Sequence, residues 1–431
     1  MKKKIIKSIK FFLQTLGAIP FLFVIFPLIA FVRLKNKKII KPALVWGSTP
    51  IISYSYWSKA MQLAGYTSKT FTNGFYSSIN NRDDWDIIIQ DKYKYLPHIF
   101  KYFLAFIESL FRYDVFFMSF DGFFLGLTPL WRLESQLLRM AGKKTVLMPY
   151  GSDSYVYRNI KSTALNHALL MSYPKASMCQ EQVAKRVAYW CTHADVVITG
   201  IMGPDGFGRW DTIVPSVIHL DTNIWKASSN VVLANGKNET VFIAHAPNHR
   251  GFKGTEFLLD AIKKLQSEGL KVELILLEKM KNEVVRKTLQ AKADILVEQL
   301  IFGHGLNALE GMASGIPVIS NVEDDNYILP FKRWSYFSEC PLVSASPETL
   351  LDVLRKLVTR PELRKQLGKA GREYVEKYHG FDSAQYLFTN VIEYIYGRKD
   401  SIINLYHPLL GEYPNRSPKI KHPLVNNRII D

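Results

Sequence analysis

Cysteine is scarce in this sequence, and the usual motifs for metal and nucleotide-phosphate binding are missing. The three cysteines, Cys179, Cys191 and Cys340, have neither an even count nor the spacing of zinc ligands. They indicate reduced thiols in a cytosolic compartment, which excludes a disulfide-stabilised secreted domain. The chain has no Asp-x-Asp metal motif, no Walker-type phosphate loop and no internal repeat. We therefore expect neither a bound metal nor a cofactor.

Acidic residues are absent from residues 1–41, a stretch that holds ten lysines and arginines. The formal net charge of the whole chain is +17, so much of the basic excess lies at one end. Between two basic clusters, residues 11–32 carry no charge; as a helix they would rise roughly 33 Å, enough to cross a bilayer core of about 30 Å. No small-x-small cleavage site follows, which argues against a removed signal peptide. The pattern predicts a membrane-associated segment that attracts anionic lipids.

The way in which this segment meets the membrane stays open. Five basic residues stand at each end, so the positive-inside rule favours neither end over the other. Pro20 and Pro27 each remove a helix hydrogen bond within the apolar stretch. An in-plane or re-entrant element with both ends in the cytosol fits both observations, while a single membrane span and a buried core helix remain as alternatives. Because the charge borders an apolar segment, it favours a membrane surface over nucleic acid as the partner.

The rest of the chain alternates apolar strands with helical segments. This alternation predicts parallel sheets covered by helices on both faces, an α/β fold, and 431 residues suffice for two such domains. Aromatic residues crowd residues 93–131, which indicates either core packing or a second surface at the membrane interface. Residues 321–341 predict no regular element. Strands are predicted at 43–46, 66–71, 86–90, 115–120, 145–149, 195–199, 240–246, 271–277 and 294–298.

The most specific pattern lies at residues 297–320, which predict a strand, a glycine-containing loop, a short helix and a second strand. Gly303 and Gly305 let the backbone approach a ligand closely or adopt a positive φ. The helix begins near Leu306, where unpaired N–H groups suit a phosphate. Farther along this helix, Glu310 can accept hydrogen bonds from a ribose diol. Together these features predict a nucleotide site.

Eleven positions from Gly303 to Ile319 match the pattern G-x-G-L-x-x-L-E-x-M-A-x-G-x-P-V-I. This stretch resembles the family 4 glycosyltransferases of GT-B fold. The resemblance implies two Rossmann-like domains facing across a cleft, and a retaining, metal-independent transfer from a nucleotide-diphosphate sugar. Where the family usually has an earlier glutamate, this chain has Phe302, and the nearest upstream carboxylate is Glu298. The implied nucleotide-sugar contacts are Gly303, Gly305, Leu306, Asn307, Glu310 and Glu298.

A basic loop follows the strand predicted at 240–246. Arg250, Lys253 and Gly254 resemble the Arg-x-x-Lys-Gly element of the same family. A guanidinium can bind phosphate oxygens in bidentate fashion, and a lysine adds a compact charge. Because preorganised cations stabilise a departing diphosphate, Arg250 and Lys253 are predicted to be catalytic. A solvated basic turn is the alternative.

The first domain is expected to contribute the acceptor side of the site. Gly47 follows the first strand, at the edge where open α/β sheets bind ligands. Gly151, Ser152 and Asp153 resemble the family's His-Gly-Ser-Asp run, with Tyr150 in place of the histidine. Asp153 is predicted to be a catalytic carboxylate on the acceptor side, beside Gly47, Gly151 and Ser152. A helix N-cap is the alternative role for such an aspartate.

The predicted organisation has five parts: a membrane-association segment over 1–41, an acceptor domain over 42–225, a nucleotide-sugar domain over 226–380, a crossover helix over 381–397 and a basic tail over 398–431. We expect a bacterial glycosyltransferase at the cytoplasmic face of the inner membrane. Its acceptor would be a lipid-linked or surface glycan in capsule, O-antigen or exopolysaccharide synthesis. A GT-B sugar epimerase and a non-catalytic GT-B scaffold of a glycan-assembly complex are the alternatives.

Overall fold

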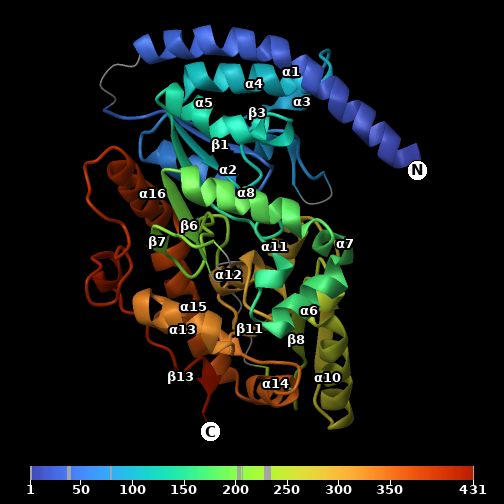
Figure 1. Cartoon of the computed structure of the whole chain (residues 1–431). Coiled ribbons are helices and arrows are strands. Elements are labelled where there is room, and N and C mark those ends of the chain that lie inside the picture. The colour runs from blue at the N-terminus through green and yellow to red at the C-terminus, as the bar shows by residue number, and fades with distance from the viewer. Residues whose placement is uncertain are drawn as a thin grey trace.

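Two parallel β-sheets organise the chain (Figure 1). The computed structural model describes residues 2–35, 40–77, 80–200, 205, 207–227 and 234–430. The first sheet has the strand order β3-β2-β1-β4-β5-β6-β7, and the second has the order β12-β11-β10-β8-β9. Strand β1 is buried along its whole length, as expected for a parallel sheet with helices on both faces. The predicted α/β architecture with two sheets is confirmed.

The strands follow the sequence prediction closely, with one short strand added in each sheet, β7 in the first and β12 in the second. The first sheet contains β1 (Leu44–Ser48), β2 (Ser68–Thr72), β3 (Ile87–Ile88), β4 (Val115–Met118), β5 (Lys144–Leu147), β6 (Val196–Thr199) and the added β7 (Thr212–Ile213). The second sheet contains β8 (Val241–His245), β9 (Val272–Leu276), β10 (Ile295–Gln299), β11 (Val318–Ser320) and β12 (Val343–Ser344).

Helices connect these strands and cover the sheets. Those of the first half are α1 (Lys2–Lys35), α2 (Ile52–Leu63), α3 (Ile89–Lys92), α4 (His98–Arg112), α5 (Glu134–Met140), α6 (Thr163–Ser172), α7 (Pro174–Ser177) and α8 (Gln180–His193). Those of the second half are α9 (Arg250–Lys253), α10 (Thr255–Ser267), α11 (Asn282–Ala291), α12 (Leu306–Ala313), α13 (Asp325–Trp334), α14 (Leu350–Thr359), α15 (Pro361–His379) and α16 (Phe381–Ile395).

Two of the sequence predictions are wrong in detail. The strand predicted at 86–90 is only two residues long, because the polar run after Ile89 continues as the short helix α3. Residues 321–341, for which the sequence predicts no element, contain α13. Its N-cap Asp324 accepts a hydrogen bond from the Asn326 N–H at 3.1 Å, a favourable helix start.

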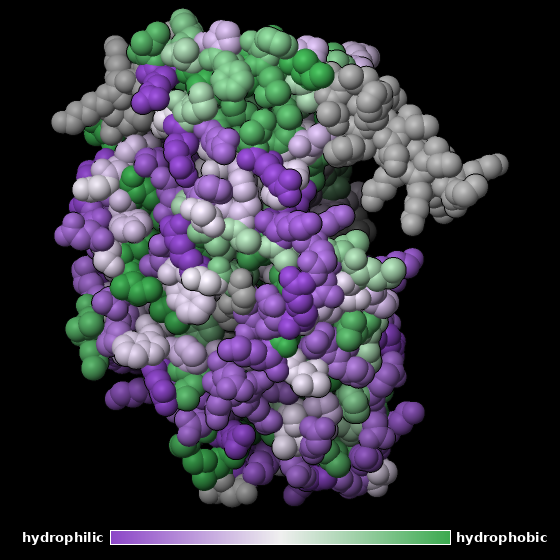
Figure 2. Space-filling view, in the orientation of Figure 1, coloured by the Kyte–Doolittle hydropathy of each residue, from purple (hydrophilic) through white to green (hydrophobic). Residues whose placement is uncertain are grey.

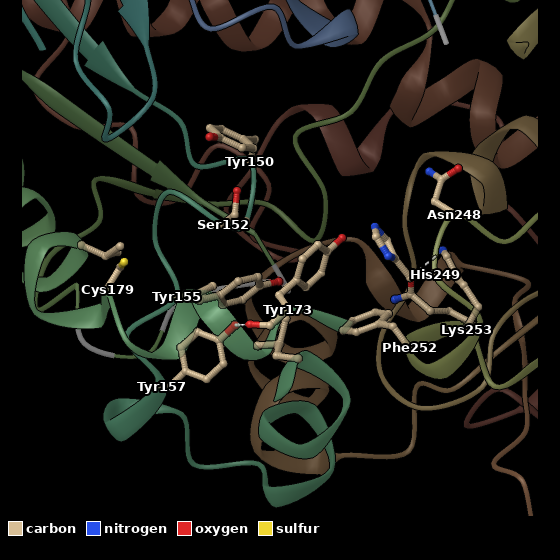
Figure 3. A pocket seen from close by; sticks show the side chains of 15 residues that line it. Tyr150, Ser152, Tyr155, Tyr157, Tyr173, Cys179, Asn248, His249, Phe252 and Lys253 are labelled. Atoms are coloured by element: carbon tan, nitrogen blue, oxygen red, sulfur yellow. Dashed lines mark hydrogen bonds between the residues drawn. The ribbon is translucent and has the colours of Figure 1, made fainter. Parts of the chain in front are cut away.

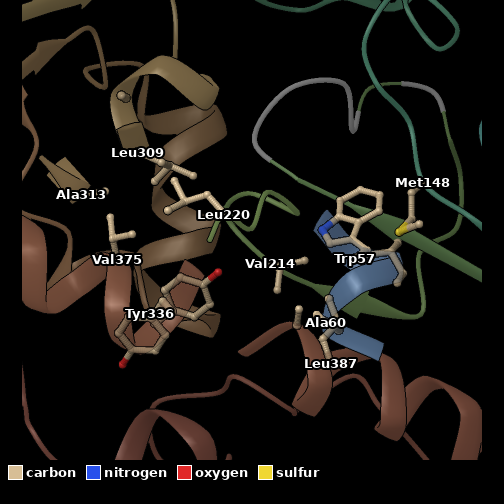
Figure 4. Close-up of a cluster of buried hydrophobic side chains, with 14 of the residues drawn as sticks. Trp57, Ala60, Met148, Val214, Leu220, Leu309, Ala313, Tyr336, Val375 and Leu387 are labelled. Carbon is tan, nitrogen blue, oxygen red and sulfur yellow. The ribbon is translucent and has the colours of Figure 1, made fainter. Parts of the chain in front are cut away.

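One hydrophobic core joins the two halves of the molecule (Figure 4). Helix α16 follows the second sheet in sequence but packs on α2 of the first domain. There the Phe388 ring lies 4.9 Å from Trp46 of β1, and Trp46 stacks on Phe117 of β4 at 3.9 Å. Gln385 also donates a hydrogen bond to the Ala60 carbonyl at 2.9 Å. These contacts join α16, which follows the second sheet in sequence, to the first domain; the predicted domain boundaries stay predictions.

Helix α1 runs along the outside of the first domain, beside α4 and α5 (Figure 1). It is continuous through Pro20 and Pro27. One face is buried against the domain; there Phe21 stacks on Phe103 of α4 with ring centroids 4.2 Å apart. The buried positions repeat every three or four residues, as one face of a helix requires: Ala18, Phe21, Ile25, Ile29 and Val32. Residues 36–39, within the second basic cluster, lie outside the described residues.

The opposite face of α1 is apolar and exposed to solvent. Figure 2 shows hydrophobic residues gathered at the end of the molecule where α1 and α4 lie. Among the described residues, α1 is the one helix long and apolar enough to cross a membrane, over Gly17–Leu34. We call the exposed apolar side chains of the two helices the α1–α4 surface: Ile19, Phe23, Val24, Phe26, Phe31, Leu34, Phe100, Leu104 and Phe111.

Within residues 398–430, a hairpin lies beside the second sheet, although the sequence predicts no clear element for 398–431. Strands β13 (Leu424–Val425) and β14 (Arg428–Ile429) form a hairpin whose turn residues Asn426 and Asn427 have positive φ, as a tight hairpin turn requires. The Asn427 carbonyl accepts a hydrogen bond from the Ser344 N–H of β12 at 2.8 Å.

Candidate active site

The second sheet reverses its strand order between β8 and β10, and the loops after these two strands meet at that point. Open α/β sheets bind ligands at such a reversal, outside the carboxyl ends of the strands. The Leu300 N–H donates a hydrogen bond to the Lys253 carbonyl at 3.3 Å. The Lys253 ammonium donates to the side chains of Glu298 and, at 2.7 Å, Gln299. The basic loop and the glycine loop predicted from sequence are therefore neighbours.

The glycine loop is held in place from both sides. Gly303 has a φ of +66° and donates its N–H to the Asn321 carbonyl at 2.7 Å. Glu298 is buried, and its carboxylate accepts hydrogen bonds from the Gly305 N–H at 3.3 Å and the Ser320 hydroxyl at 3.1 Å. Helix α12 begins directly afterwards, at Leu306, where the first N–H groups have no partner within a helix.

Glu310 lies one turn into α12 and is buried. Its carboxylate accepts hydrogen bonds from the side-chain amides of Asn282 at 2.6 Å and Asn307 at 3.1 Å. Burial raises the pKa of this carboxyl to about 7, although both amides favour its ionised form. The prediction of a hydrogen-bond acceptor at this place on the helix fits the geometry.

The basic loop after β8 contains the short helix α9, and we call it the α9 loop. Its two basic residues, Arg250 and Lys253, differ in their surroundings. Lys253 is largely buried and faces inward, with a side-chain exposure of 16%. Arg250 lies on the rim, where it pairs with Glu256 at 2.8 Å and Glu278 at 3.1 Å. Lys253 is therefore the cation that already faces the site, whereas Arg250 would have to exchange its carboxylate partners for a phosphate.

Asp153 organises the turn after β5. Its buried carboxylate accepts backbone N–H bonds from Phe120 at 3.0 Å, Tyr150 at 2.9 Å and Gly151 at 3.0 Å. Burial raises the pKa of this carboxyl to about 7. These contacts make Asp153 a residue that positions Tyr150, Gly151 and Ser152; its catalytic role stays a prediction.

Gly47 belongs to the sheet rather than to the site surface. A side chain at this position would meet the Phe71 carbonyl oxygen at 2.0 Å, so glycine is required for packing against β2. The first turn of α2, from Ile52 to Tyr54, instead reaches the cleft. The acceptor-side role predicted for Gly47 stays a prediction.

Two adjoining cavities occupy the cleft between the domains. The α2 cavity, about 320 Å³, lies between the first turn of α2, residues 215–218 and the start of α12 at His304, Gly305 and Leu306. The tyrosine cavity, about 470 Å³, lies between the segment 150–183 and the α9 loop. Tyr150, Tyr155 and Gln299 line both cavities.

Several buried polar atoms at these cavities have no hydrogen-bond partner among the residues that the structure describes. They are the hydroxyls of Tyr54 and Tyr155 and the Nδ1 atom of His304. Burial lowers the pKa of His304 to about 4, so its ring is neutral near pH 7. An unpartnered buried polar atom is costly, and a polar ligand in the cleft would remove that cost.

Comparison with known proteins gives a fold but no close relative. No family model and no curated protein matches the sequence. Among solved structures, sucrose-phosphate synthase from Thermosynechococcus elongatus matches with a TM-score of 0.51 and 13% identity, over 83% of this chain and 100% of that one. An alpha-glucosyltransferase in complex with UDP and a 13-mer DNA matches with a TM-score of 0.50 and 10% identity, over 83% and 100%. The chain has the GT-B fold.

A glycosyltransferase from Rickettsia africae matches with a TM-score of 0.49 and 12% identity, over 84% of this chain and all of that one. The GT-B fold confirms the expected pair of Rossmann-like domains that face each other across a cleft. It also accounts for the position of the predicted residues, since the carboxyl edges of both sheets contribute loops to the two cavities.

Several residues of this GT-B cleft were not predicted from the sequence. Tyr155 and Tyr157 come directly after the predicted Gly-Ser-Asp run, and this spacing is the one signal that could have identified them. Tyr173 and His249 approach each other across the domains with ring centroids 4.5 Å apart. Their proximity depends on α6 packing against α9, which local sequence does not encode.

The raised pKa of Glu310 predicts a pH dependence for donor binding. We expect the affinity for a nucleotide-diphosphate sugar to rise about tenfold from pH 6 to pH 8, because the ionised fraction of a group with a pKa of about 7 rises from roughly a tenth to nine-tenths. The ionised carboxylate can accept both ribose hydroxyls. Titration calorimetry on wild type and Glu310→Gln measures this effect. Equal pH dependence in the two proteins would contradict this prediction. The dependence would then come from another group, such as Asp153, whose pKa is also about 7.

Proposed function

We propose that this GT-B protein is a glycosyltransferase that uses a nucleotide-diphosphate sugar as donor. Three groups carry the proposal: Glu310, the first N–H groups of α12, and Lys253. They lie after β8 and β10, where the strand order of the second sheet reverses, and we call them the nucleotide-binding line. This line lies opposite the Tyr150 turn of the first domain, and the cavities between them have walls from both domains. A donor on one side and an acceptor on the other would meet in that cleft.

Each member of the line suits one part of the donor. Glu310 would hold the ribose hydroxyls, with Asn282 and Asn307 orienting its carboxylate. The N–H groups of Leu306 and Asn307 would face the diphosphate, where the positive end of α12 favours negative charge. Lys253 would add a full positive charge beside Glu298, and Arg250 could join from the rim.

The proposed reaction moves the sugar with retention of configuration. The acceptor hydroxyl oxygen bonds to the anomeric carbon as the bond from that carbon to the diphosphate oxygen breaks. The hydroxyl proton passes to the departing nucleoside diphosphate. Lys253 and the α12 amides would stabilise the charge that develops on the leaving group, and we propose that they do so without a metal ion.

We also propose that the α1–α4 surface lies on the cytoplasmic face of the bacterial inner membrane. The packing of Phe21 on Phe103 supports the in-plane form of α1, because a spanning helix would have to leave α4. Its exposed face carries Phe23 and Phe26, and basic clusters stand in the sequence at both ends. Such a helix places its apolar face among the acyl chains and its cations beside anionic headgroups. The acceptor would then be a lipid-linked or surface glycan.

A panel of sugar donors tests the donor site. We expect UDP-, GDP- or ADP-glucose to bind to wild type, and CMP-sialic acid, which has one phosphate, to bind weakly. Glu310→Gln should lower the affinity of the bound class at least tenfold, through the loss of a charged hydrogen-bond acceptor. Glu283→Gln serves as the matched control, because Glu283 stands beside Asn282 but pairs with Lys287 on the surface.

The result also separates the alternatives. If no donor binds, or if Glu310→Gln binds like wild type, the donor-site assignment is wrong and a non-catalytic scaffold becomes the better interpretation. If a donor binds and its sugar changes configuration without any acceptor, the protein is an epimerase. Transfer that requires an added glycan acceptor supports the glycosyltransferase.

A further inference from the structure

The tyrosine cavity is walled by aromatic side chains from both domains (Figure 3). The first domain supplies them from the Tyr150 turn and from the segment that contains α6 and α7; the second supplies them from the α9 loop. The aromatic residues that line it are Tyr150, Tyr155, Tyr157, Tyr173, His249 and Phe252. None of them belongs to the nucleotide-binding line, so their chemistry needs its own explanation.

The cavity lies where the sugar of a bound donor would project. The start of α12, at Gly305 and Leu306, borders the α2 cavity, whereas Lys253 lines the tyrosine cavity. Gln299, which accepts a hydrogen bond from Lys253 at 2.7 Å, lies on the wall between the two. A nucleoside diphosphate that runs from Glu310 to Lys253 therefore ends at the tyrosine cavity.

The lining of the cavity is neutral. Lys253 is the one ionised residue among the described lining side chains, and in the proposed complex Glu298 and the donor diphosphate already engage its charge. Burial and the nearby lysines lower the pKa of His249, so that ring is uncharged near pH 7. An anionic ligand would gain no further cation here and would lose its hydration. A neutral ligand meets no such penalty.

Aromatic rings and a few polar groups suit the two kinds of surface on a pyranose. The C–H faces of a sugar ring can pack on the flat faces of tyrosines, which bury much area at low entropy cost. The sugar hydroxyls need partners, and the buried Tyr155 hydroxyl has none in the described part of the chain. Ser152, Asn248 and Gln299 add further polar groups to the wall.

Phe302 belongs to the same aromatic group. Its ring meets Tyr327 edge to face at 4.8 Å, and it is clustered with Tyr155, Tyr157 and Phe252. The residue that stands where the sequence family usually has a glutamate thus packs behind the cavity wall. Aromatic packing takes the place of a carboxylate at this side of the site.

We propose that the tyrosine cavity binds neutral pyranoses, both the sugar that is transferred and the terminal sugar residue that accepts it. This inference rests on the proposed function, and it narrows the substrates to neutral sugars rather than uronic or sialic acids. The unpartnered Tyr155 hydroxyl binds a sugar hydroxyl, and the rings of Tyr150 and Tyr173 lie against the sugar faces.

Cys179 offers a direct probe of this cavity. It is exposed and lines the cavity, whereas Cys191 and Cys340 are buried. Burial raises the pKa of those two thiols to about 11 and about 12. N-ethylmaleimide should therefore modify Cys179 first, since the thiolate is the reactive form. Mass spectrometry of full-length protein follows the rate of this modification.

Neutral sugars should slow the modification of Cys179, and anionic sugars should not. The probes are the methyl pyranosides of glucose, galactose and mannose, each set against its uronic acid. We expect at least one neutral probe to slow the reaction fivefold or more at saturation. Tyr155→Phe should raise the concentration needed for half-protection by about two- to tenfold, the loss of one hydrogen bond. Equal protection by uronates, or no protection by any neutral probe, would overturn the proposal.

The modified protein separates this proposal from the proposed function. Modified wild type should bind the nucleoside diphosphate of its donor as before but lose at least tenfold in transfer rate. For Cys179→Ser, treatment with N-ethylmaleimide should leave the transfer rate equal to that of the same variant before treatment. Full transfer by the modified protein would overturn the sugar cavity and leave the donor site standing. If no nucleoside diphosphate binds, the proposed function fails, while protection by neutral sugars would still decide the cavity.

Discussion

The double variant Phe23→Glu/Phe26→Glu is expected to lose at least 100-fold in affinity for vesicles that contain phosphatidylglycerol. Both side chains are exposed on the α1–α4 surface, and burying one phenylalanine is worth roughly 1.5–3 kcal/mol. Two lost phenylalanines and two added negative charges beside anionic lipid act in the same direction. Vesicle co-sedimentation of full-length protein measures the change.

Phe257→Glu is the matched control for this experiment. Phe257 lies on α10 of the second domain and is 49% exposed, close to the 48% of Phe26. Its variant should bind vesicles like wild type. If the double variant binds as tightly as the control, the α1–α4 surface is not the membrane contact. Resistance of wild type to alkaline extraction from membranes would favour a single span over the in-plane helix.

Replacing Lys253 should produce the largest loss of activity. We expect Lys253→Met to lower kcat/KM for transfer by about 10²- to 10³-fold, the usual effect of removing one preorganised group that stabilises transition-state charge. The same variant leaves Glu298, with a side-chain exposure of 1%, without its cation. Breaking such a buried pair costs about 3–5 kcal/mol of folding stability.

The second variant Lys253→Met/Glu298→Gln separates these two effects. It removes both charges, so most of the stability should return while transfer stays low. Lys264→Met, which removes a surface lysine paired with Asp260 on α10, should change neither quantity. Thermal unfolding and initial transfer rates measure the two effects. Recovery of transfer in the double variant would show that Lys253 acts through the fold and not on the diphosphate.

The donor half of the site could be predicted from sequence because its geometry is local. The stretch 297–320 contains a strand, a loop and a helix in a fixed order, and these alone place Glu310 relative to Gly305. Lys253 comes from another segment, but the loops after β8 and β10 must meet where the strand order of the sheet reverses. The sequence pattern and the sheet topology were therefore sufficient to predict where these residues lie relative to one another.

The tyrosine half could not be predicted because it depends on contacts between domains. Helix α6, which is followed by α7, packs on α9 beside the site, and nothing local in 163–172 marks that partner. The role of Asp153 had the same difficulty. Its spacing fits either a carboxylate that faces the cleft or one that accepts backbone N–H bonds. The hydrogen bond from the Phe120 N–H, which is distant in sequence, shows that it makes the second kind of contact.

The apolar helix α1 illustrates a third limit. A run of uncharged residues gives the same sequence signal whether it spans a membrane, lies on its surface or packs into a core. The stacking of Phe21 on Phe103, which lies in the aromatic stretch 93–131, shows that α1 packs along the first domain. Both interpretations of that stretch have support, since α4 has one face in the core and another beside α1 that is exposed.

The C-terminal hairpin covers part of one margin of the second sheet. Strand β12 ends the second sheet on one side, and an unpaired sheet margin can recruit a strand from another molecule. The Asn427 carbonyl takes up the Ser344 N–H, and its side-chain amide donates to the Cys340 and Leu342 carbonyls at 2.9 and 3.0 Å. The last residues of the chain thus occupy hydrogen-bonding groups through which neighbouring copies could otherwise join into aggregates.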